Sequence, residues 1–230
     1  MKLSKIQLIW YINRVLKRLK ILKGEIYMID KICSYLTDKI RKEMPEVDDE
    51  RAEIIMYGLQ NLIGELPKGI LILLISYFLG IIKLTVLAIL IIAPYRGMSG
   101  GVHLKTHIGC IITSFILYNG PALFGKYIVL DGYAKIIIAL IIWIFCMIML
   151  KLYAPADTEN VPILREKERK QKQILSFIIL SIEFIIAIFI DNPTISGIII
   201  FGDFIQTLTI TRVAYNITKN RYGHEVYANN

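Results

Sequence analysis

Long runs of Ile, Leu and Phe, separated by short polar segments, occupy most of the chain beyond residue 66. A bilayer is crossed by about 20 apolar helical residues, and a helix satisfies its own backbone hydrogen bonds in lipid. We therefore predict an all-α polytopic membrane bundle of about six helices. The predicted spans are residues 69–79 with a start shortly before Pro67, 80–94, 106–124, 133–153, 172–190 and 195–215.

The second run, residues 80–94, is shorter than a usual span. A segment of this length either thins the bilayer or fails to cross it. A bundle of four spans with two re-entrant or interfacial segments is the alternative, so the predicted number is four to six. Both arrangements place the two chain ends on the same side of the membrane.

Residues 1–50 show a different pattern, in which charged and apolar positions mix at helical spacing. The strongly basic residues 1–23 predict an amphipathic interfacial helix, and residues 28–50 predict a second one that ends near Pro45. Because Met28 opens a less basic segment, the residues before it are either part of the functional core or an upstream extension. The predicted regions are an interfacial region 1–50, a helical bundle 51–215 and a cytoplasmic tail 216–230.

The formal charge of +8 is concentrated in the first 23 residues and in residues 165–172. In the six-span arrangement, the N-terminus, the loops 96–105 and 154–171 and the C-terminus share one face of the membrane. That face holds nearly all loop Lys and Arg, which predicts that it is cytoplasmic. Basic clusters of this kind contact anionic lipid, so we expect membrane lipids as partners and no nucleic acid.

The chemistry-bearing stretch is Arg96-Gly97-Met98-Ser99-Gly100-Gly101-Val102-His103, followed by Cys110. A thiol beside an imidazole is typical of cysteine-nucleophile catalysis. In one continuous helix the two side chains would lie about 10.5 Å apart along the axis, so the segment must bend. The glycines permit such a bend, and Thr106 is a suitable N-cap that places Cys110 in the first turns of a helix.

Other interpretations of the same residues remain open. Gly-Gly before a helix often serves packing alone, and Arg96 either holds a substrate carboxylate or phosphate or anchors the loop to lipid headgroups. His103, His107 and Cys110 at i, i+4 and i+7 would suit a soft metal such as zinc. Because a fourth ligand is missing, we predict no metal and no other cofactor. The three cysteines are too few and too scattered for a disulfide framework, so Cys110 is expected as a free thiol.

The order of motifs resembles the accessory gene regulator B (AgrB) family of membrane cysteine endopeptidases. The resemblance covers roughly residues 28–215. The matching elements are Gln60, Arg96, Gly100-Gly101-x-His103, Cys110, Tyr153-Ala154-Pro155-Ala156-Asp157-Thr158 and Pro162-Ile163 with a basic run.

The resemblance implies that this chain processes an AgrD-like propeptide in the bacterial cytoplasmic membrane, with its active site toward the cytoplasm. Cys110 would attack a peptide carbonyl, with His103 as general base and then general acid. A thioester acyl-enzyme would follow, and a thiol or hydroxyl of the peptide would close a thiolactone or lactone ring. The product would be a quorum-sensing autoinducing peptide. A homodimer is expected on family grounds.

The remaining family positions receive supporting roles by the same resemblance. Gln60 either donates to an oxyanion or bridges helices, and Arg96, Gly100 and Gly101 are candidates for oxyanion stabilisation or support. His107 stands where many members have a small hydroxyl residue, so it is an accessory candidate that could replace His103 as the base.

A second class of function rests on Glu183 and Asp203, which fall within apolar runs. Intramembrane carboxyl groups are costly unless they are paired or protonated. They pair with Arg212 or with each other, line a transit path, or are simply buried and hydrogen-bonded. The alternative to an enzyme is therefore a non-catalytic transporter or receptor for a small peptide, with the Gly-rich loop as a hinge.

Overall fold

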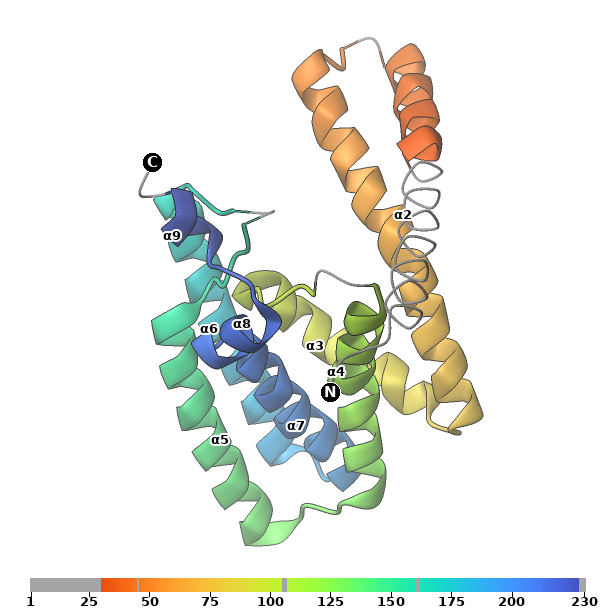
Figure 1. Cartoon of the computed structure of the whole chain (residues 1–230). Coiled ribbons are helices and arrows are strands. Elements are labelled where there is room, and N and C mark those ends of the chain that lie inside the picture. Colours follow the sequence, from red (N-terminus) through yellow and green to blue (C-terminus); the bar gives the residue numbers. More distant parts are fainter. Residues whose placement is uncertain (1–29, 45, 105–106, 160–161, 228–230) are drawn as a thin grey trace, which may run out of the picture. The chain divides into compact units, whose positions relative to one another are not determined.

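A computed structural model describes residues 30–44, 46–104, 107–159 and 162–227 of the 230-residue chain. These residues form helices and connecting loops without a β-strand, which confirms the predicted all-α membrane bundle (Figure 1). The interfacial helix predicted for residues 1–23 lies outside the described residues. The chain divides into two compact units, Met1–Ile70 and Leu71–Asn230, which are described separately.

The first unit holds a helix over residues 30–43 and the beginning of α2 (Asp49–Phe78). The turn between them is fixed by polar contacts, since Asp48 accepts from the Arg51 amide at 2.8 Å and Arg41 pairs with Asp49 at 2.7 Å. The first helix ends shortly before Pro45, as its pattern predicted. Helix α2 continues through Pro67 instead of starting near it.

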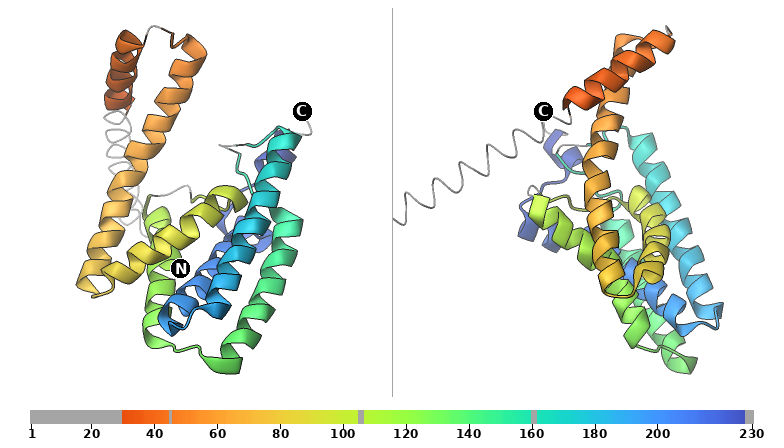
Figure 2. Two further views of the ribbon diagram at one scale, coloured as in Figure 1. Left: turned by 180° about the vertical axis from the view of Figure 1, so that it is seen from behind. Right: turned by 90° about the vertical axis from the view of Figure 1, so that its right-hand side faces the viewer.

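Among its described residues, the second unit contains the end of α2 and seven further helices. Their bounds are α3 (Ile82–Ser99), α4 (His107–Tyr127), α5 (Gly132–Tyr153), α6 (Glu166–Phe189), α7 (Pro193–Thr209), α8 (Arg212–Thr218) and α9 (Gly223–Tyr227). Helix α7 lies among α3, α4, α5 and α6 and contacts all four (Figure 2). It accordingly buries ten residues, whereas the longer α5 buries three and exposes the rest of its apolar surface.

Close approach between α4 and α7 depends on small residues. A Cβ at Gly125 would meet the Thr194 carbonyl oxygen at 2.5 Å, and Gly197 faces the Gly125 backbone. Further along, the rings of Phe124 and Phe201 stack with their centroids 3.4 Å apart. These contacts hold α7 at the centre of the unit.

Three described helices, α3, α5 and α6, are long and apolar enough to cross a membrane. The pair α7 and α8, bent by 63°, makes a fourth if it is counted as one broken span. Of the predicted runs 69–79 and 106–124, residues 69–78 and 107–124 are helical, as parts of α2 and α4. Within the part of the chain that the structure describes, three to four helices are thus candidate spans, against a predicted four to six.

Three segments far apart in the sequence meet at one end of the second unit. They are the loop after α3, the loop between α5 and α6, and the chain after α8 (Figure 1). The Gly101 amide donates to the Ala156 carbonyl at 2.9 Å, and Asn220 Nδ2 donates to the His103 carbonyl at 2.8 Å. The two loops and the C-terminal segment therefore lie together at one end of the second unit.

Candidate functional site

Arg96, in the last turn of α3, anchors the Gly-rich loop. Its Nη1 donates to Gln206 Oε1 at 2.9 Å and to Thr209 Oγ1 at 3.3 Å, and its Nη2 donates to the Val102 carbonyl at 3.0 Å. The guanidinium thus bridges α3, the end of α7 and the loop that follows Gly101. A fork of donors in fixed geometry suits this task, which a lysine ammonium performs less well.

Gly100 and Gly101 bring the loop against two neighbouring segments. Gly100 has φ +75° and forms a parallel bridge with Ala156, and a Cβ there would collide with the Ala156 carbonyl. Gly101 has φ +141°, and a Cβ there would meet Thr209 Oγ1 at 2.5 Å. Glycine is required at both positions for conformation and for space. Their amides donate to the carbonyls of Arg96 and Ala156, so both glycines support the loop through these bonds.

Gln206 on α7 also holds the Gly-rich loop in place. Its Nε2 donates to the Gly100 carbonyl at 2.7 Å and to Ser99 Oγ at 3.0 Å, and its side chain is fully buried. The sequence analysis did not single out Gln206 or Thr209. Their signal was present, because an amide and a hydroxyl three residues apart in an apolar run need partners when buried.

A cavity of about 370 Å³ lies beside the anchored loop. Such a volume falls within the range of small-molecule and peptide side-chain sites. One wall comes from α3, α4 and the Gly-rich loop, and the other comes from the loop between α5 and α6 and from Lys172 of α6. The lining residues used below are Arg96, Gly100, Gly101, His103 and Asp157.

The predicted catalytic pair lies on either side of the start of α4. His103 has an exposed side chain and lines the cavity. Cys110 is half-buried at the fourth residue of α4 and is not among the residues that line this cavity. The side chains of His107, the first residue of α4, and of Gln60, within α2 of the first unit, lie outside what the structure describes. The structure therefore brings Arg96, both glycines and His103 to one cavity.

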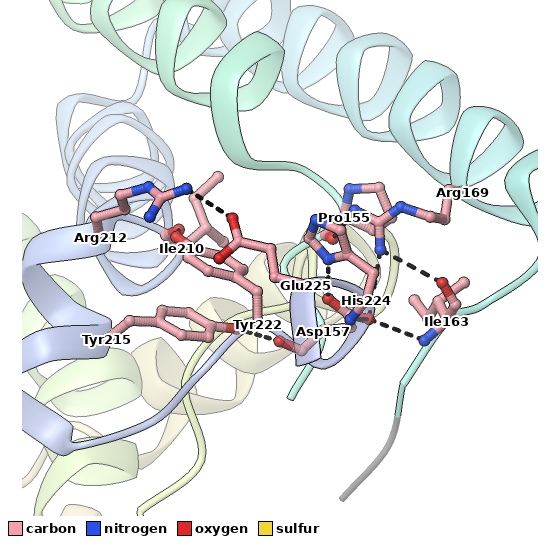
Figure 3. A network of polar contacts seen from close by, with 10 residues as sticks. All are labelled: Pro155, Asp157, Ile163, Arg169, Ile210, Arg212, Tyr215, Tyr222, His224 and Glu225. Carbon is pink, nitrogen blue, oxygen red and sulfur yellow. Dashed lines mark hydrogen bonds and ion pairs between the residues drawn. The ribbon is translucent and has the colours of Figure 1, made fainter. Parts of the chain in front are cut away.

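Asp157 is the centre of a polar network at the opposite wall (Figure 3). Its carboxylate is buried and accepts from the Ile163 amide at 2.9 Å and from the His224 amide at 2.8 Å. The His224 ring Nδ1 lies 2.7 Å from Asp157 Oδ1, and Arg169 Nη1 lies 3.4 Å from Oδ2. Four groups from three segments thus converge on one carboxylate.

Two tyrosines support the same network. Tyr215 donates its hydroxyl to the Asp157 carbonyl at 2.9 Å, and Tyr222 donates to the Ile210 carbonyl at 2.8 Å. Their rings stack with centroids 4.0 Å apart. Burial raises the pKa of the Tyr222 hydroxyl above its ordinary value, so it remains a donor at neutral pH. Asp157 falls within a motif of the sequence, whereas no sequence pattern indicates a role for His224.

The intramembrane carboxyl groups lie away from this end of the unit. Asp203 on α7 has no exposed surface, and its carboxyl group lies against that of Glu183 on α6. Neither Asp203 oxygen has a hydroxyl, amide or cationic donor among the described residues. Arg212 instead pairs with Glu225 at 2.6 Å. Of the options open at the sequence level, pairing of Glu183 or Asp203 with Arg212 is therefore not what the structure shows.

Comparisons with known proteins agree with the motif order. An AgrB-like protein of Clostridium acetobutylicum is 24% identical over 87% of this chain and 94% of its own length. AgrB-like proteins of Listeria welshimeri and Clostridium perfringens are 28% and 27% identical, over 82% and 84% of this chain and 91% and 95% of their own lengths. No solved structure matches the chain.

The profile of the Accessory gene regulator B family matches residues 33–210. This stretch contains the Gly-rich loop, Cys110 and Asp157, and it ends before His224. The chain therefore belongs to the AgrB family.

Proposed function

We propose that the protein is an integral membrane cysteine endopeptidase that removes the C-terminal tail of an AgrD-like propeptide and promotes cyclisation of the remaining peptide. The observation that carries this proposal is the exposure of Cys110. Cys33 and Cys146 are fully buried, whereas Cys110 is half-buried at the start of a helix. A nucleophilic thiol must reach its substrate, so Cys110 is the candidate.

Cys110 lies in the first turn of α4, close to the catalytic partner that we propose. His103 stands in the loop that leads into α4, next to the cavity where we place the peptide.

In the proposed reaction His103 takes the proton of the Cys110 thiol, and the sulfur attacks the scissile carbonyl carbon. The C–N bond then breaks, His103 gives the proton to the leaving amine, and the tail departs. His103 then takes the proton of a thiol or hydroxyl of the bound peptide, which attacks the thioester carbonyl and closes the ring. The C–S bond to Cys110 breaks, and the Cys110 sulfur receives that proton from His103. Arg96 and the two glycines act by fixing the loop that carries His103.

Co-expression with an AgrD-like propeptide tests the proposal. The propeptide carries an epitope on its tail, and the fragments are identified by mass spectrometry. We expect wild-type protein and the Cys146→Ser control to release the tail, and Cys110→Ser and His103→Ala to leave the propeptide intact. Tail release by Cys110→Ser at the wild-type level, in protein still inserted in the membrane, would overturn the assignment.

A peptide transporter or receptor is the alternative function, and the Glu183–Asp203 pair is the observation that favours it. Such a protein would depend on these carboxyl groups and tolerate loss of the Cys110 thiol. Asp203→Asn in the same co-expression assay separates the two functions. Under our proposal the variant retains tail cleavage, whereas a transporter would lose peptide secretion while Cys110→Ser secretes normally.

A further inference from the structure

A second cavity, of about 340 Å³, opens at the same end of the second unit, between the end of α5, the start of α6 and the C-terminal segment. The first two turns of α6 present Glu166, Arg169, Lys170 and Gln173 to it. These positions follow the i, i+3, i+4, i+7 spacing of one helix face. Gln173 also donates to the Leu150 carbonyl at 3.3 Å, which ties α6 to α5.

The lining of this cavity is cationic. Four basic side chains face two carboxylates, and these residues are Lys151, Arg169, Lys170, Arg212, Glu166 and Glu225. The N-terminus of α6 also directs the positive end of its helix dipole to this cavity, and its N-cap residue makes no side-chain cap hydrogen bond. The proposed catalytic residues Cys110 and His103 are not part of this lining.

The cations divide into two kinds. Arg212 is held by Glu225 at 2.6 Å, and Arg169 is held by the buried Asp157 at 3.4 Å and by the Pro155 carbonyl at 3.3 Å. Within the part of the chain that the structure describes, no carboxylate lies within ion-pair distance of Lys151 or Lys170. Two ammonium groups beside a fixed guanidinium are thus available for an external anion (Figure 3 shows the Arg169 and Arg212 pairs).

The place of the cavity indicates what kind of anion it takes. Lys151 lies in the last turn of α5, and Lys170 lies in the second turn of α6, and both helices are candidate spans. The cavity therefore lies at the adjoining ends of two candidate spans. Leu152, which lines it, is 61% exposed, and apolar side chains of the same two helices continue from it. Those exposed side chains are Ile148, Ile174, Leu175 and Ile178.

From this juxtaposition of unpaired lysines and an exposed apolar strip, we propose that the cavity binds the phosphodiester headgroup of an anionic phospholipid. The Lys151 and Lys170 ammonium groups contact the phosphate oxygens, and the acyl chains lie along the exposed apolar side chains of α5 and α6. A basic pocket between spans is suited to such headgroups. An acidic peptide would match the lysines but would leave the apolar strip uncovered.

Native mass spectrometry of the purified full-length protein tests this site. The protein is titrated with phosphatidylglycerol or phosphatidylcholine, and bound lipid is counted for wild type, for Lys151→Gln/Lys170→Gln and for a control. The control is Lys83→Gln/Lys126→Gln. It removes two exposed lysines that do not line the cavity, one at the start of α3 and one at the end of α4. Circular dichroism and melting temperature show whether each variant is folded.

We expect wild type and the control to retain phosphatidylglycerol in preference to phosphatidylcholine. The cavity variant should bind phosphatidylglycerol about tenfold or more weakly, because each lysine near a headgroup contributes to its retention. Equal retention by a folded cavity variant would overturn the proposal. Release of the lipid by excess inorganic phosphate would show a free-phosphate site, and release by an oligoglutamate peptide would show a peptide site; either result would overturn the lipid assignment.

Discussion

The His224 ring nitrogen Nδ1 lies 2.7 Å from Oδ1 of Asp157, although the two residues are 67 positions apart. This contact joins the C-terminal segment to the loop between α5 and α6. Asn220, four residues earlier, makes the corresponding bond to the His103 carbonyl. The C-terminal segment thus contacts both loops that border the candidate catalytic cavity.

Removing the Asp157 carboxylate should destabilise the protein more than removing one of its partners. Asp157→Asn turns one buried oxygen into a donor that faces other donors, and we expect a loss of about 2–3 kcal/mol. His224→Ala should cost about 1 kcal/mol, because the ring is partly exposed and its screened contact is weaker. Denaturation in detergent micelles, followed by circular dichroism, measures both.

The matched control is Arg221→Ala, which removes an exposed ion pair to Glu159 at 3.6 Å. Such pairs contribute little, so its unfolding free energy should stay within about 0.5 kcal/mol of wild type. If Asp157→Asn were no more destabilising than this control, the network would not stabilise the loop.

Gly100→Ala should be poorly tolerated. The residue has φ +75°, and the added methyl group would collide with the Ala156 backbone, so either the helix end or the Ala156 loop must move. We expect a loss of about 2 kcal/mol or more in unfolding free energy. Gly97→Ala is the control, since it lies inside α3 with nothing within 4 Å of an added Cβ. That change should be neutral or mildly stabilising, and an equal effect of both substitutions would contradict the account.

Arg96→Lys distinguishes a positioning role from substrate binding. Lysine cannot reproduce bonds to Gln206, Thr209 and the Val102 carbonyl at once. If Arg96 fixes the Gly-rich loop that carries His103, kcat for tail release falls about tenfold or more while KM stays close to wild type. Kinetics with a synthetic propeptide in proteoliposomes provide both constants. A rise in KM with unchanged kcat would instead indicate that Arg96 holds a substrate carboxylate.

Tyr222 gives a pH-dependent prediction. Its pKa is raised in the folded protein by burial, so above about pH 10 the unfolded chain loses the hydroxyl proton while the folded protein keeps it. Stability contributed by this group is therefore full below pH 10 and falls as the pH rises further. Tyr222→Phe loses the bond to the Ile210 carbonyl, about 1 kcal/mol at neutral pH.

The difference in unfolding free energy between wild type and Tyr222→Phe should shrink from pH 8 to pH 11. Parallel denaturation series at several pH values measure it, and the other tyrosines cancel because both proteins share them. A difference that stays constant over this range would show that the Tyr222 hydroxyl does not titrate with folding.

The positions of the main helices could be predicted because lipid imposes a simple requirement on composition and length. The run 133–153 corresponds closely to α5. The start of α6 was placed too late, at residue 172 instead of Glu166, because its charged first turns look like a solvated loop. In the structure those turns form the helix face that lines the second cavity, between α5, α6 and the C-terminal segment.

The break between α7 and α8 illustrates a second limit. The apolar run 195–215 predicted one span, whereas the structure bends by 63° after Thr209. Thr211 acts as the N-cap of α8 by accepting from the Ala214 amide, which is a local signal that a hydropathy pattern does not weigh. Two polar residues near this break, Gln206 and Thr209, accept hydrogen bonds from Arg96, and Gln206 also donates to the Gly100 carbonyl.

The residues of the candidate site also differ in how well the sequence could predict them. Arg96, Gly100, Gly101 and His103 lie close in sequence, so one motif revealed them together. His224 meets Asp157 only through the folding of the whole second unit, and no periodicity predicts such a long-range pair. Its one available signal was a histidine in a short tail, which is weak alone.

The most direct test of the central claim is to look for the covalent intermediate on Cys110. Purified protein in proteoliposomes is mixed with a propeptide whose cyclising residue is replaced by alanine, and intact masses are recorded before and after hydroxylamine. We predict an adduct equal in mass to the propeptide without its tail, located on Cys110, released by hydroxylamine and absent from Cys110→Ala. Tail cleavage without such an adduct, or an adduct on another residue, would contradict the proposed mechanism.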